Sequence, residues 1–254
     1  MQTRLFHKDD KPVSLLGLGC MRLPIIDGND AAIDYEKAQQ LVDYAYANGV
    51  NYFDTAHGYH GGQSQVFLGK ALKKYPRDSY YLATKLPLWN VKSKDDIAKI
   101  FERQLELLDT DYFDFYLLHS LDANNYKRSL DFEAYEFIAE QQARGRIKYI
   151  GFSFHDSPEL LEEIAGRFRW DFAQLQINYV DWKNQQADRQ YAILEQKGIP
   201  CIVMEPVRGG SLARPGEKAQ AILELADAHA SPASWALRYA ASFPNVFTVL
   251  SGMS

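Results

Sequence analysis

Cysteine is scarce in this sequence. Only two occur among 254 residues, Cys20 and Cys201, and they lie far apart in apolar, strand-like segments. A disulfide framework or a zinc site requires more cysteines at closer spacing. We interpret both as buried, reduced thiols, the usual state of an isolated apolar cysteine. The sequence therefore predicts no metal ligands, and we expect a reducing, cytoplasmic location.

Long apolar runs and an excess of basic residues are also absent. No segment approaches the roughly 20 apolar residues of a membrane span, and the first ten residues lack the apolar centre of a signal peptide. The 28 lysines and arginines against 33 acidic residues give a net charge of −5. We therefore expect no membrane and no nucleic acid as partner. What remains is an ordinary globular balance, 46% hydrophobic and 24% charged, suited to a small-molecule substrate. The oligomeric state is left open.

Strand-like and helical patterns alternate along almost the whole chain. The strand-like runs cover residues 15–19, 51–54, 80–85, 112–119, 147–153, 172–178, 199–205 and 246–251. The helical patterns cover 36–47, 65–74, a segment opened by Asp95 and Asp96, 131–144, 157–169, 187–197, 217–228 and 232–242. Eight strands in strict alternation predict an α/β fold, a (β/α)8 TIM barrel, as one domain over residues 1–254. Residues 4–13 are expected to form a hairpin that closes the bottom of the barrel.

No helical pattern follows the eighth strand. The sequence thus predicts a barrel that lacks its final outer helix. Uncovered apolar strand surface costs on the order of 25 cal/mol per Å². We expect either a longer natural product or another element over this gap.

Four reactive side chains are placed at the ends of neighbouring strands. Asp54, Lys85 and His119 end the second, third and fourth strands, and Tyr59 follows in the loop after the second. In a (β/α)8 barrel these ends form the active site. A free tyrosine has a pKa near 10, and an adjacent ammonium lowers it, so Lys85, oriented by Asp54, is expected to lower the pKa of Tyr59. His119 would hydrogen-bond a substrate carbonyl, and Tyr59 would protonate the alkoxide, an effect of about 10²–10⁴ in rate.

A metal-dependent hydrolase is a weaker interpretation of the same residues. His119 and Asp54 have no companion ligands at metal-binding spacing. The four side chains together instead indicate the reduction of a carbonyl group.

These motifs resemble those of the aldo-keto reductase family over essentially the whole length. The matching segments are residues 17–22, 53–59, 84–85, 117–119, 151–153, 174–179 and 205–210. The resemblance implies a barrel that binds NADP(H) in extended form. It also implies an enzyme that reduces an aldehyde, ketone or quinone, with Asp54, Tyr59, Lys85 and His119 as catalytic residues.

The resemblance also implies a set of cofactor-binding residues. Ser153 and Gln176 would hold the nicotinamide carboxamide. The others would border the nicotinamide or follow the pyrophosphate: Met21, Arg22, Asp54, Met204, Glu205, Pro206, Val207, Gly209 and Gly210. Phe154 departs from the family, since asparagine is common there, and Met204 stands where a tyrosine often stacks. For the substrate pocket we expect His57, Trp89 and Tyr126.

Two features leave the cofactor and the role open. The basic residues that usually bind the 2′-phosphate lie beyond the eighth strand, so NAD(H) is not excluded. Residues 19–24 and 153–155 are similar to a subgroup with a C-terminal 4Fe-4S ferredoxin-type extension, which residues 1–254 do not contain; a cluster is expected only with such an extension. The alternative function is a cofactor-binding regulatory or redox-partner subunit with little turnover.

Overall fold

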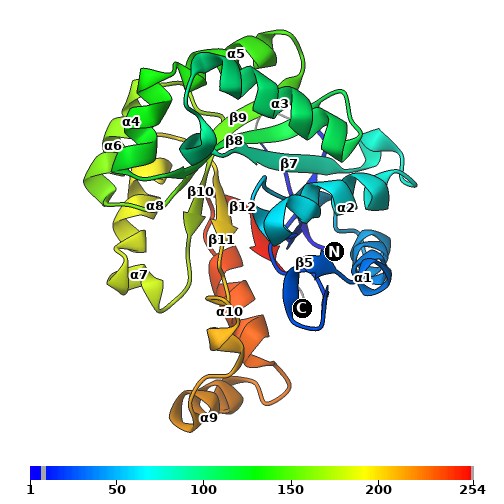
Figure 1. Cartoon of the computed structure of the whole chain (residues 1–254). Helices are drawn as coiled ribbons and strands as arrows, with labels where there is room; N and C mark the ends of the chain where they lie inside the picture. Colours follow the sequence, from blue (N-terminus) through cyan, green and yellow to red (C-terminus); the bar gives the residue numbers. More distant parts are fainter. Residues whose placement is uncertain (7–9, 253–254) are drawn as a thin grey trace.

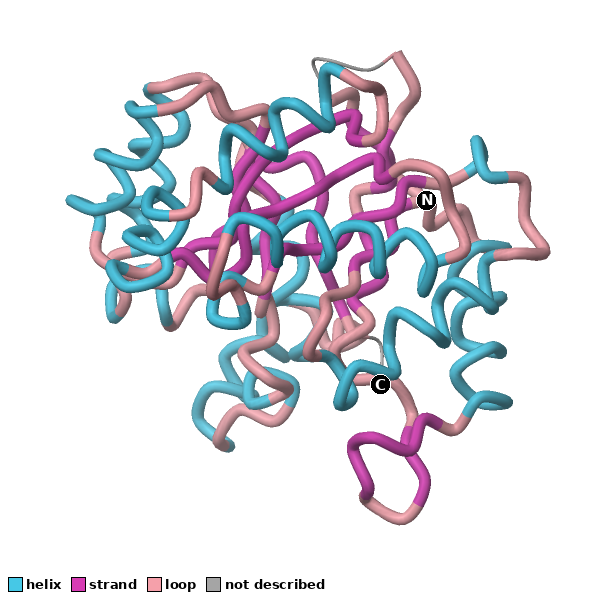
Figure 2. The backbone as a smooth tube through the Cα atoms, turned by 45° about the horizontal axis from the view of Figure 1, so that its top comes forward, coloured by secondary structure: helices cyan, strands magenta, loops and turns pink. Residues whose placement is uncertain are grey.

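The structure is a computed structural model, which describes residues 1–6 and 10–252. Eight parallel strands close a barrel in the order β10-β11-β12-β3-β6-β7-β8-β9 (Figures 1 and 2). Their bounds are β3 Leu16–Gly19, β6 Tyr52–Asp54, β7 Tyr81–Leu86, β8 Phe113–Leu121, β9 Ile147–Phe154, β10 Phe172–Gln176, β11 Cys201–Met204 and β12 Val246–Ser251. The predicted TIM barrel is confirmed, and each predicted strand falls within two residues of an observed one.

Helices surround the barrel and bury one face each against it. They are α1 Tyr35–Ala47, α2 Gln63–Leu72, α3 Lys94–Leu108, α4 Ala123–Asp131, α5 Ala134–Ala143, α6 Pro158–Arg167, α8 Ala187–Gln196 and α10 Pro232–Ala241. In α3 the carboxylate of Asp96 accepts a hydrogen bond from the backbone N–H of Ser93 and closes the first turn. The same helix buries Ile97, Phe101 and Leu108. For α3, the sequence thus indicates both where the helix begins and which of its faces is buried.

Three short elements were missed by the sequence patterns. The helix expected over 131–144 is α5, whereas α4, which precedes it and is separated from it by Glu133 in a left-handed conformation, was not predicted. A single turn, α7 Asp181–Asn184, follows β10, and β4 Ile25–Ile26 pairs with β5 Asn29–Ile33 in a small hairpin. Each is too short or too polar to give a periodic signal.

The N-terminal segment closes the bottom of the barrel. β1 Thr3–Arg4 pairs antiparallel with β2 Val13–Ser14, as the predicted hairpin requires, although residues 7–9 within it lie outside the described residues. Phe6 and Val13 are buried in the lower interior with Tyr52, Phe115 and other aromatic side chains. This filling leaves the opposite end, where the strands terminate, as the open one.

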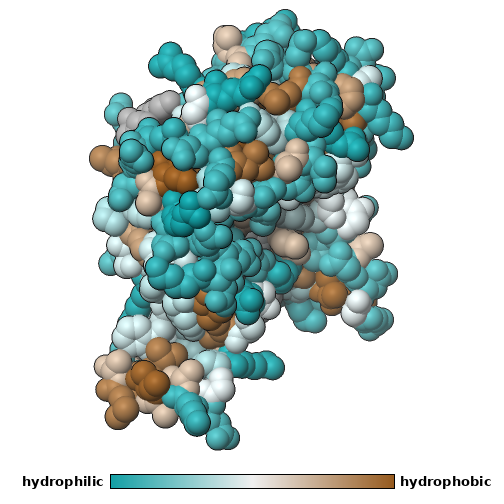
Figure 3. All heavy atoms as spheres, turned by 90° about the vertical axis from the view of Figure 1, so that its left-hand side faces the viewer, coloured by the Kyte–Doolittle hydropathy of each residue, from teal (hydrophilic) through white to brown (hydrophobic). Residues whose placement is uncertain are grey.

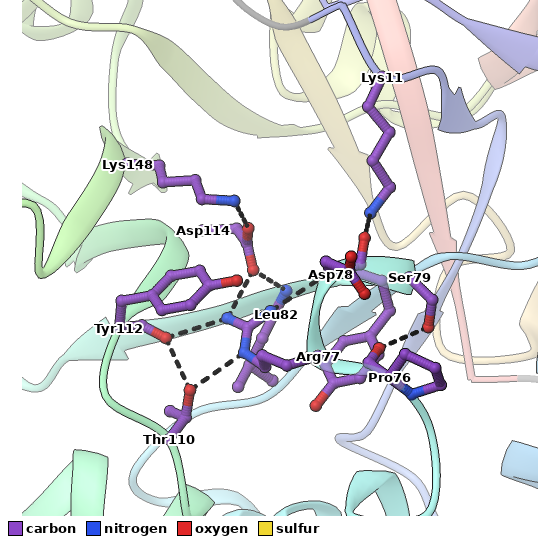
Figure 4. Close-up of polar contacts among 11 residues, drawn as sticks. Lys11, Pro76, Arg77, Asp78, Ser79, Leu82, Thr110, Tyr112, Asp114 and Lys148 are labelled. Carbon is purple, nitrogen blue, oxygen red and sulfur yellow. Dashed lines mark hydrogen bonds and ion pairs between the residues drawn. The ribbon is translucent and has the colours of Figure 1, made fainter.

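A buried carboxylate ties three strands together at the closed end (Figure 4). Asp114 of β8 is 1% exposed and accepts hydrogen bonds from the backbone N–H of Leu82 in β7 at 2.9 Å and from Arg77 at 2.7 Å. Lys148 of β9 forms an ion pair with its second oxygen at 2.8 Å. Two cations and one amide compensate the buried charge. These contacts of Asp114 fix the relative positions of β7, β8 and β9 at the closed end of the barrel.

At the other edge of the fold, apolar surface remains uncovered. Among residues up to 252, no helix follows β12, and a groove there is lined by residues that include Leu15, Leu16 and Leu237. The helix α9, Glu217–Ala226, stands away from the barrel with Ile222 67% and Leu225 89% exposed (Figures 1 and 3). Within the described chain, no helix has the length and apolar character needed to cross a membrane.

The packing of α2 against α3 depends on the absence of a side chain at Gly69. A Cβ at this position would lie 2.6 Å from the carbonyl oxygen of Leu107 and 2.8 Å from the Cα of Leu108. Because both are backbone atoms, the helices must separate. We expect Gly69→Ala to lower the free energy of unfolding by about 2 kcal/mol, although alanine favours a helix by about 1 kcal/mol. Urea unfolding curves measure this change.

Gly166 in α6 provides the matched control. A Cβ there meets only the flexible end of Lys197, at 3.4 Å. Gly166→Ala is expected to be neutral or to stabilise the fold by up to about 1 kcal/mol. Equal stabilities of the two variants would contradict the close approach of α2 and α3.

Candidate active site

Three adjacent strands bring the four predicted catalytic side chains to one cavity. Asp54 ends β6, Lys85 lies near the end of β7, and His119 near the end of β8. Tyr59 opens the 3-10 turn Tyr59–Gly62 that follows β6. All four line a cavity of about 400 Å³ at the open end of the barrel. The regular spacing of the β/α units thus places them together.

Lys85 is the centre of the hydrogen-bond network. Its ammonium donates to Asp54 Oδ1 at 2.6 Å, to the carbonyl oxygen of Thr55 at 2.9 Å and to the hydroxyl of Tyr59 at 3.3 Å. These three acceptors match the three N–H bonds of an ammonium. Burial disfavours its charge, but Asp54 and Tyr59 outweigh burial and raise the pKa of Lys85. The lysine is therefore held charged beneath the tyrosine.

The net pKa shift of Tyr59 is opposite to the sequence-based expectation. Burial of the phenol raises its pKa above 10, and the attraction of Lys85 offsets only part of that rise. Lys85 acts in the expected direction, but the expected net lowering is wrong because desolvation of the phenolate is the larger effect. Tyr59 therefore carries its proton throughout the neutral range and can donate it.

His119 is held neutral. Burial, followed by the positive charge of Lys85 and the neighbouring His155 and His57, keeps its pKa well below 6.5. Its Nδ1 is buried without a hydrogen-bond partner. The ring lies 4.9 Å from that of Trp89, measured between centroids. A neutral imidazole beside Tyr59 can donate a hydrogen bond to the same ligand oxygen atom that the Tyr59 hydroxyl contacts.

These two shifts predict the pH profile of a reaction in which Tyr59 donates a proton beside a neutral His119. Since the pKa of His119 lies well below 6.5, lowering the pH to about 6 does not protonate it, and kcat/KM stays constant. Since the pKa of Tyr59 lies above 10, the acid form persists up to that pH. We expect a flat profile between about pH 6 and 9 in a constant-ionic-strength buffer series. An inflection near pH 6.5 would contradict the neutral histidine.

The predicted cofactor residues surround two adjoining cavities. The first is the cavity that Asp54, Tyr59, Lys85 and His119 line, and its other lining residues include Met21, Arg22, Ser153, Gln176, Met204, Glu205 and Gly209. The second has about 350 Å³ and is lined by Arg22, Glu205, Pro206, Val207, Gly209, Gly210 and neighbouring residues. Gly209 and Gly210 have φ of 63° and 90°, so the turn needs glycine there. The two cavities share lining residues and form one trough.

The hydrogen bonds within the protein leave certain polar atoms that line this trough available to a ligand. Ser153 Oγ accepts a hydrogen bond from the backbone N–H of Ser120 at 2.7 Å, which leaves its O–H available to donate. Gln176 Nε2 donates to Asp181 Oδ2 at 2.8 Å, which leaves Oε1 as the available acceptor. Arg22 and Glu205 form an ion pair at 2.9 Å. The cavity therefore offers the hydroxyl of Ser153 as a donor and Oε1 of Gln176 as an acceptor.

The three predicted substrate residues lie in different environments. Trp89 is 43% exposed beside His119, and His57 is half-buried near the same histidine. None of the three is among the residues that line the cavity, and Tyr126 is 5% exposed in the hydrophobic core under α4, with its hydroxyl near Glu163 of α6. The expectation for Tyr126 is corrected because α4 turns this side chain inward.

Several lining residues were missed by the sequence analysis. They are Gly19, His155, Gln174, Arg208, Leu250, Ser251 and Gly252. Gln174 carries a usable signal, since it lies two positions before Gln176 and therefore on the same face of β10. The others lie at strand ends and in loops, where alternation gives no guidance.

Among the described residues, no three histidine, cysteine, aspartate or glutamate side chains lie together in a group that could hold a metal ion. Cys20 and Cys201 are both free and buried. Burial raises the pKa of Cys20, and it raises that of Cys201 to about 12. Both thiols are therefore protonated and unreactive at neutral pH.

Comparison with known proteins relates this geometry to one family. The model of the Aldo/keto reductase family matches residues 15–254. The probable aldo-keto reductase 1 of Glycine max is 26% identical over 206 residues, which cover 78% of this chain and 57% of that protein. The NADH-specific methylglyoxal reductase of Escherichia coli (strain K12) is 26% identical over 221 residues, which cover 80% of this chain and 66% of that protein. The chain thus spans less than two thirds of either relative.

A solved structure resembles nearly the entire chain. The aldo-keto reductase AKR11C1 from Bacillus halodurans, in its holo form, superimposes with a TM-score of 0.79 at 27% identity. The match covers 99% of this chain and 87% of that structure. With the family match over residues 15–254, these findings show that the chain belongs to the aldo/keto reductase family.

Proposed function

We propose that this protein is an NADPH-dependent reductase that converts the carbonyl group of an aldehyde, ketone or quinone into an alcohol. One observation carries the proposal: the Lys85 ammonium contacts both Asp54 and the Tyr59 hydroxyl inside a cavity that His119 also lines. Membership of the aldo/keto reductase family supports the same reaction class.

The residues around the trough fit a nicotinamide cofactor. Ser153 would donate to the carboxamide oxygen, and Gln176 would accept from its nitrogen, since each has the matching atom available. Met204 would flank the nicotinamide with a polarizable thioether. The turn at Gly209 and Gly210 would let the backbone approach the pyrophosphate. When bound, the reduced nicotinamide supplies the hydride.

The protein's own contribution is to manage the proton. Tyr59 donates its phenolic proton to the alkoxide oxygen that develops from the carbonyl. The Lys85 ammonium at 3.3 Å stabilises the resulting phenolate, and Asp54 keeps that ammonium in place. His119, held neutral, donates a hydrogen bond to the same oxygen and orients the carbonyl. We propose these roles for the four side chains in addition to the reaction class that the family membership supports.

We also propose that the protein acts in the cytoplasm. Both cysteines are free and buried, and such thiols persist in reducing compartments.

Two measurements on the unmodified protein test the proposal together. Quenching of tryptophan fluorescence by NADPH and by NADH reports binding, and the loss of nicotinamide absorbance with a small α-dicarbonyl reports turnover. We expect both binding and turnover with at least one of the two cofactors. Binding without turnover of aldehydes, ketones and quinones would contradict the reductase and favour a regulatory or redox-partner subunit.

A further inference from the structure

Asp181, the first residue of α7, is a buried carboxylate behind the trough. It is 0% exposed and lines neither of the two cavities. Its Oδ2 accepts hydrogen bonds from Nε2 of Gln176 at 2.8 Å and from Nδ2 of Asn178 at 2.7 Å. Its Oδ1 forms an ion pair with Nε of Arg208 at 3.2 Å. These three partners compensate the charge that the fold removes from water.

The carboxylate determines which end of the Gln176 amide faces the cavity. An amide has a donor end and an acceptor end, whereas a carboxylate only accepts. Nε2 of Gln176 therefore turns toward Asp181, and Oε1 remains for a ligand. The backbone N–H of Ser120 orients the hydroxyl of Ser153 in the same manner and leaves its proton for an acceptor. A carboxamide, which has both a donor and an acceptor, matches these two fixed groups.

The same carboxylate also contacts the turn after β11. Arg208 lies in this turn directly before Gly209 and has a φ of 51°, in the left-handed region. Asn178, which shares Oδ2 with Gln176, donates a second hydrogen bond to the carbonyl oxygen of Glu205 at 3.1 Å. Asp181 and Asn178 thus join the end of β10 to the turn that borders the second cavity.

We propose that Asp181 is a positioning residue for the nicotinamide cofactor: it holds the Gln176 amide with Oε1 toward the cavity, where this atom accepts a hydrogen bond from the carboxamide nitrogen. The inference rests on the proposed function. Asp181 acts through Gln176 and touches neither the cofactor nor the substrate. Without an acceptor at position 181, the Gln176 amide can rotate and present Nε2 to the carboxamide nitrogen, so that two donors face each other.

The test compares two cofactors that differ in the carboxamide alone. The first is NADPH or NADH, whichever the protein binds more tightly, and the second is its 3-acetylpyridine analogue, whose methyl ketone has no N–H to donate. Dissociation constants are measured by fluorescence for the unmodified protein and for Asp181→Leu, which keeps a similar size without an acceptor. We expect Asp181→Leu to weaken binding of the natural cofactor by about three- to tenfold, the range for one hydrogen bond, and binding of the analogue by less than about twofold.

Asp181→Asn tests the role of the acceptor by rescue. Its carbonyl oxygen can still accept from Gln176, while its NH2 group faces Arg208, whose side chain is 46% exposed and can turn to solvent. We expect this variant to bind the natural cofactor within about twofold of the unmodified protein. An Asp181→Asn variant that binds as weakly as Asp181→Leu would overturn the inference, because the acceptor oxygen would then not be what orients Gln176.

Asp171 offers a matched control. It is a second buried aspartate that accepts from a glutamine amide, Nε2 of Gln142 at 2.6 Å, but it lines neither cavity. Asp171→Leu is expected to leave the ratio of the two dissociation constants unchanged. If Asp181→Leu does not fold, Asp181→Val, which also lacks an acceptor, gives the same comparison.

The outcomes separate this inference from the proposed function. Equal weakening of both cofactors by Asp181→Leu would indicate a packing role and would overturn the inference, as would unchanged binding of the natural cofactor. An unmodified protein that binds neither NADPH nor NADH would overturn the proposed function itself.

Discussion

Replacing Tyr59 by phenylalanine lowers the turnover of a carbonyl substrate by about 10²–10⁴-fold and leaves the dissociation constant of NADPH within about twofold of its original value. The substitution removes one oxygen atom and keeps the ring. That oxygen lies 3.3 Å from the Lys85 ammonium and carries the proton for the alkoxide. Loss of turnover without loss of cofactor would assign Tyr59 to the chemical step.

Steady-state kinetics and cofactor binding on the same preparation measure both quantities. Tyr44, which is 71% exposed on α1, provides the control, since Tyr44→Phe also removes one phenolic hydroxyl. We expect Tyr44→Phe to change neither quantity. A Tyr59→Phe variant that retains more than about a tenth of the turnover would rule out this hydroxyl as the general acid.

Replacing Lys85 by methionine affects both catalysis and stability. Lys85 is 1% exposed, and it is the partner of Asp54, which is 2% exposed. Without the ammonium, Asp54 remains as an uncompensated buried charge, which typically costs 3–5 kcal/mol. We therefore expect Lys85→Met to lower the free energy of unfolding by about 3–5 kcal/mol and turnover by at least about 10²-fold.

A double variant separates the effect of the broken ion pair from that of altered packing. Adding Asp54→Asn to Lys85→Met removes the uncompensated charge, so the double variant is expected to unfold at a higher urea concentration than Lys85→Met alone. Turnover should stay low in both, because neither carries the ammonium beside Tyr59. A double variant less stable than Lys85→Met would show that the buried charge is not the cause.

The positions of the candidate catalytic side chains follow from the chain's repeating pattern. Asp54, Lys85 and His119 each stand near the end of an apolar run, and a closed barrel brings such ends together. Local sequence was sufficient there because the alternation of strands and helices determines which end is open. The same pattern predicted all eight strands.

The pKa values, the burial of individual side chains and the long-range ion pairs depend on the tertiary structure, which local sequence patterns do not indicate. The pKa of Tyr59 is raised because the folded chain buries the phenol. The sequence indicates only the neighbouring Lys85, which acts in the opposite direction. The sequence places Tyr126 in a loop at the mouth of the barrel, whereas the structure places it in the helix α4. Within α4, Tyr126 and Ser129 are buried three positions apart, a weak stripe in a short polar helix. The ion pair of Arg22 with Glu205 joins residues far apart in the sequence and needs the fold to be seen.

The most direct test of the account is to follow the hydride itself. NADPH deuterated at the transferring position of nicotinamide C4 is incubated with the protein and a dicarbonyl, and the product is analysed by NMR. The account predicts an alcohol with deuterium on the former carbonyl carbon, formed by the unmodified protein and strongly diminished with Tyr59→Phe. Bound NADPH that transfers no deuterium to any carbonyl carbon would contradict it.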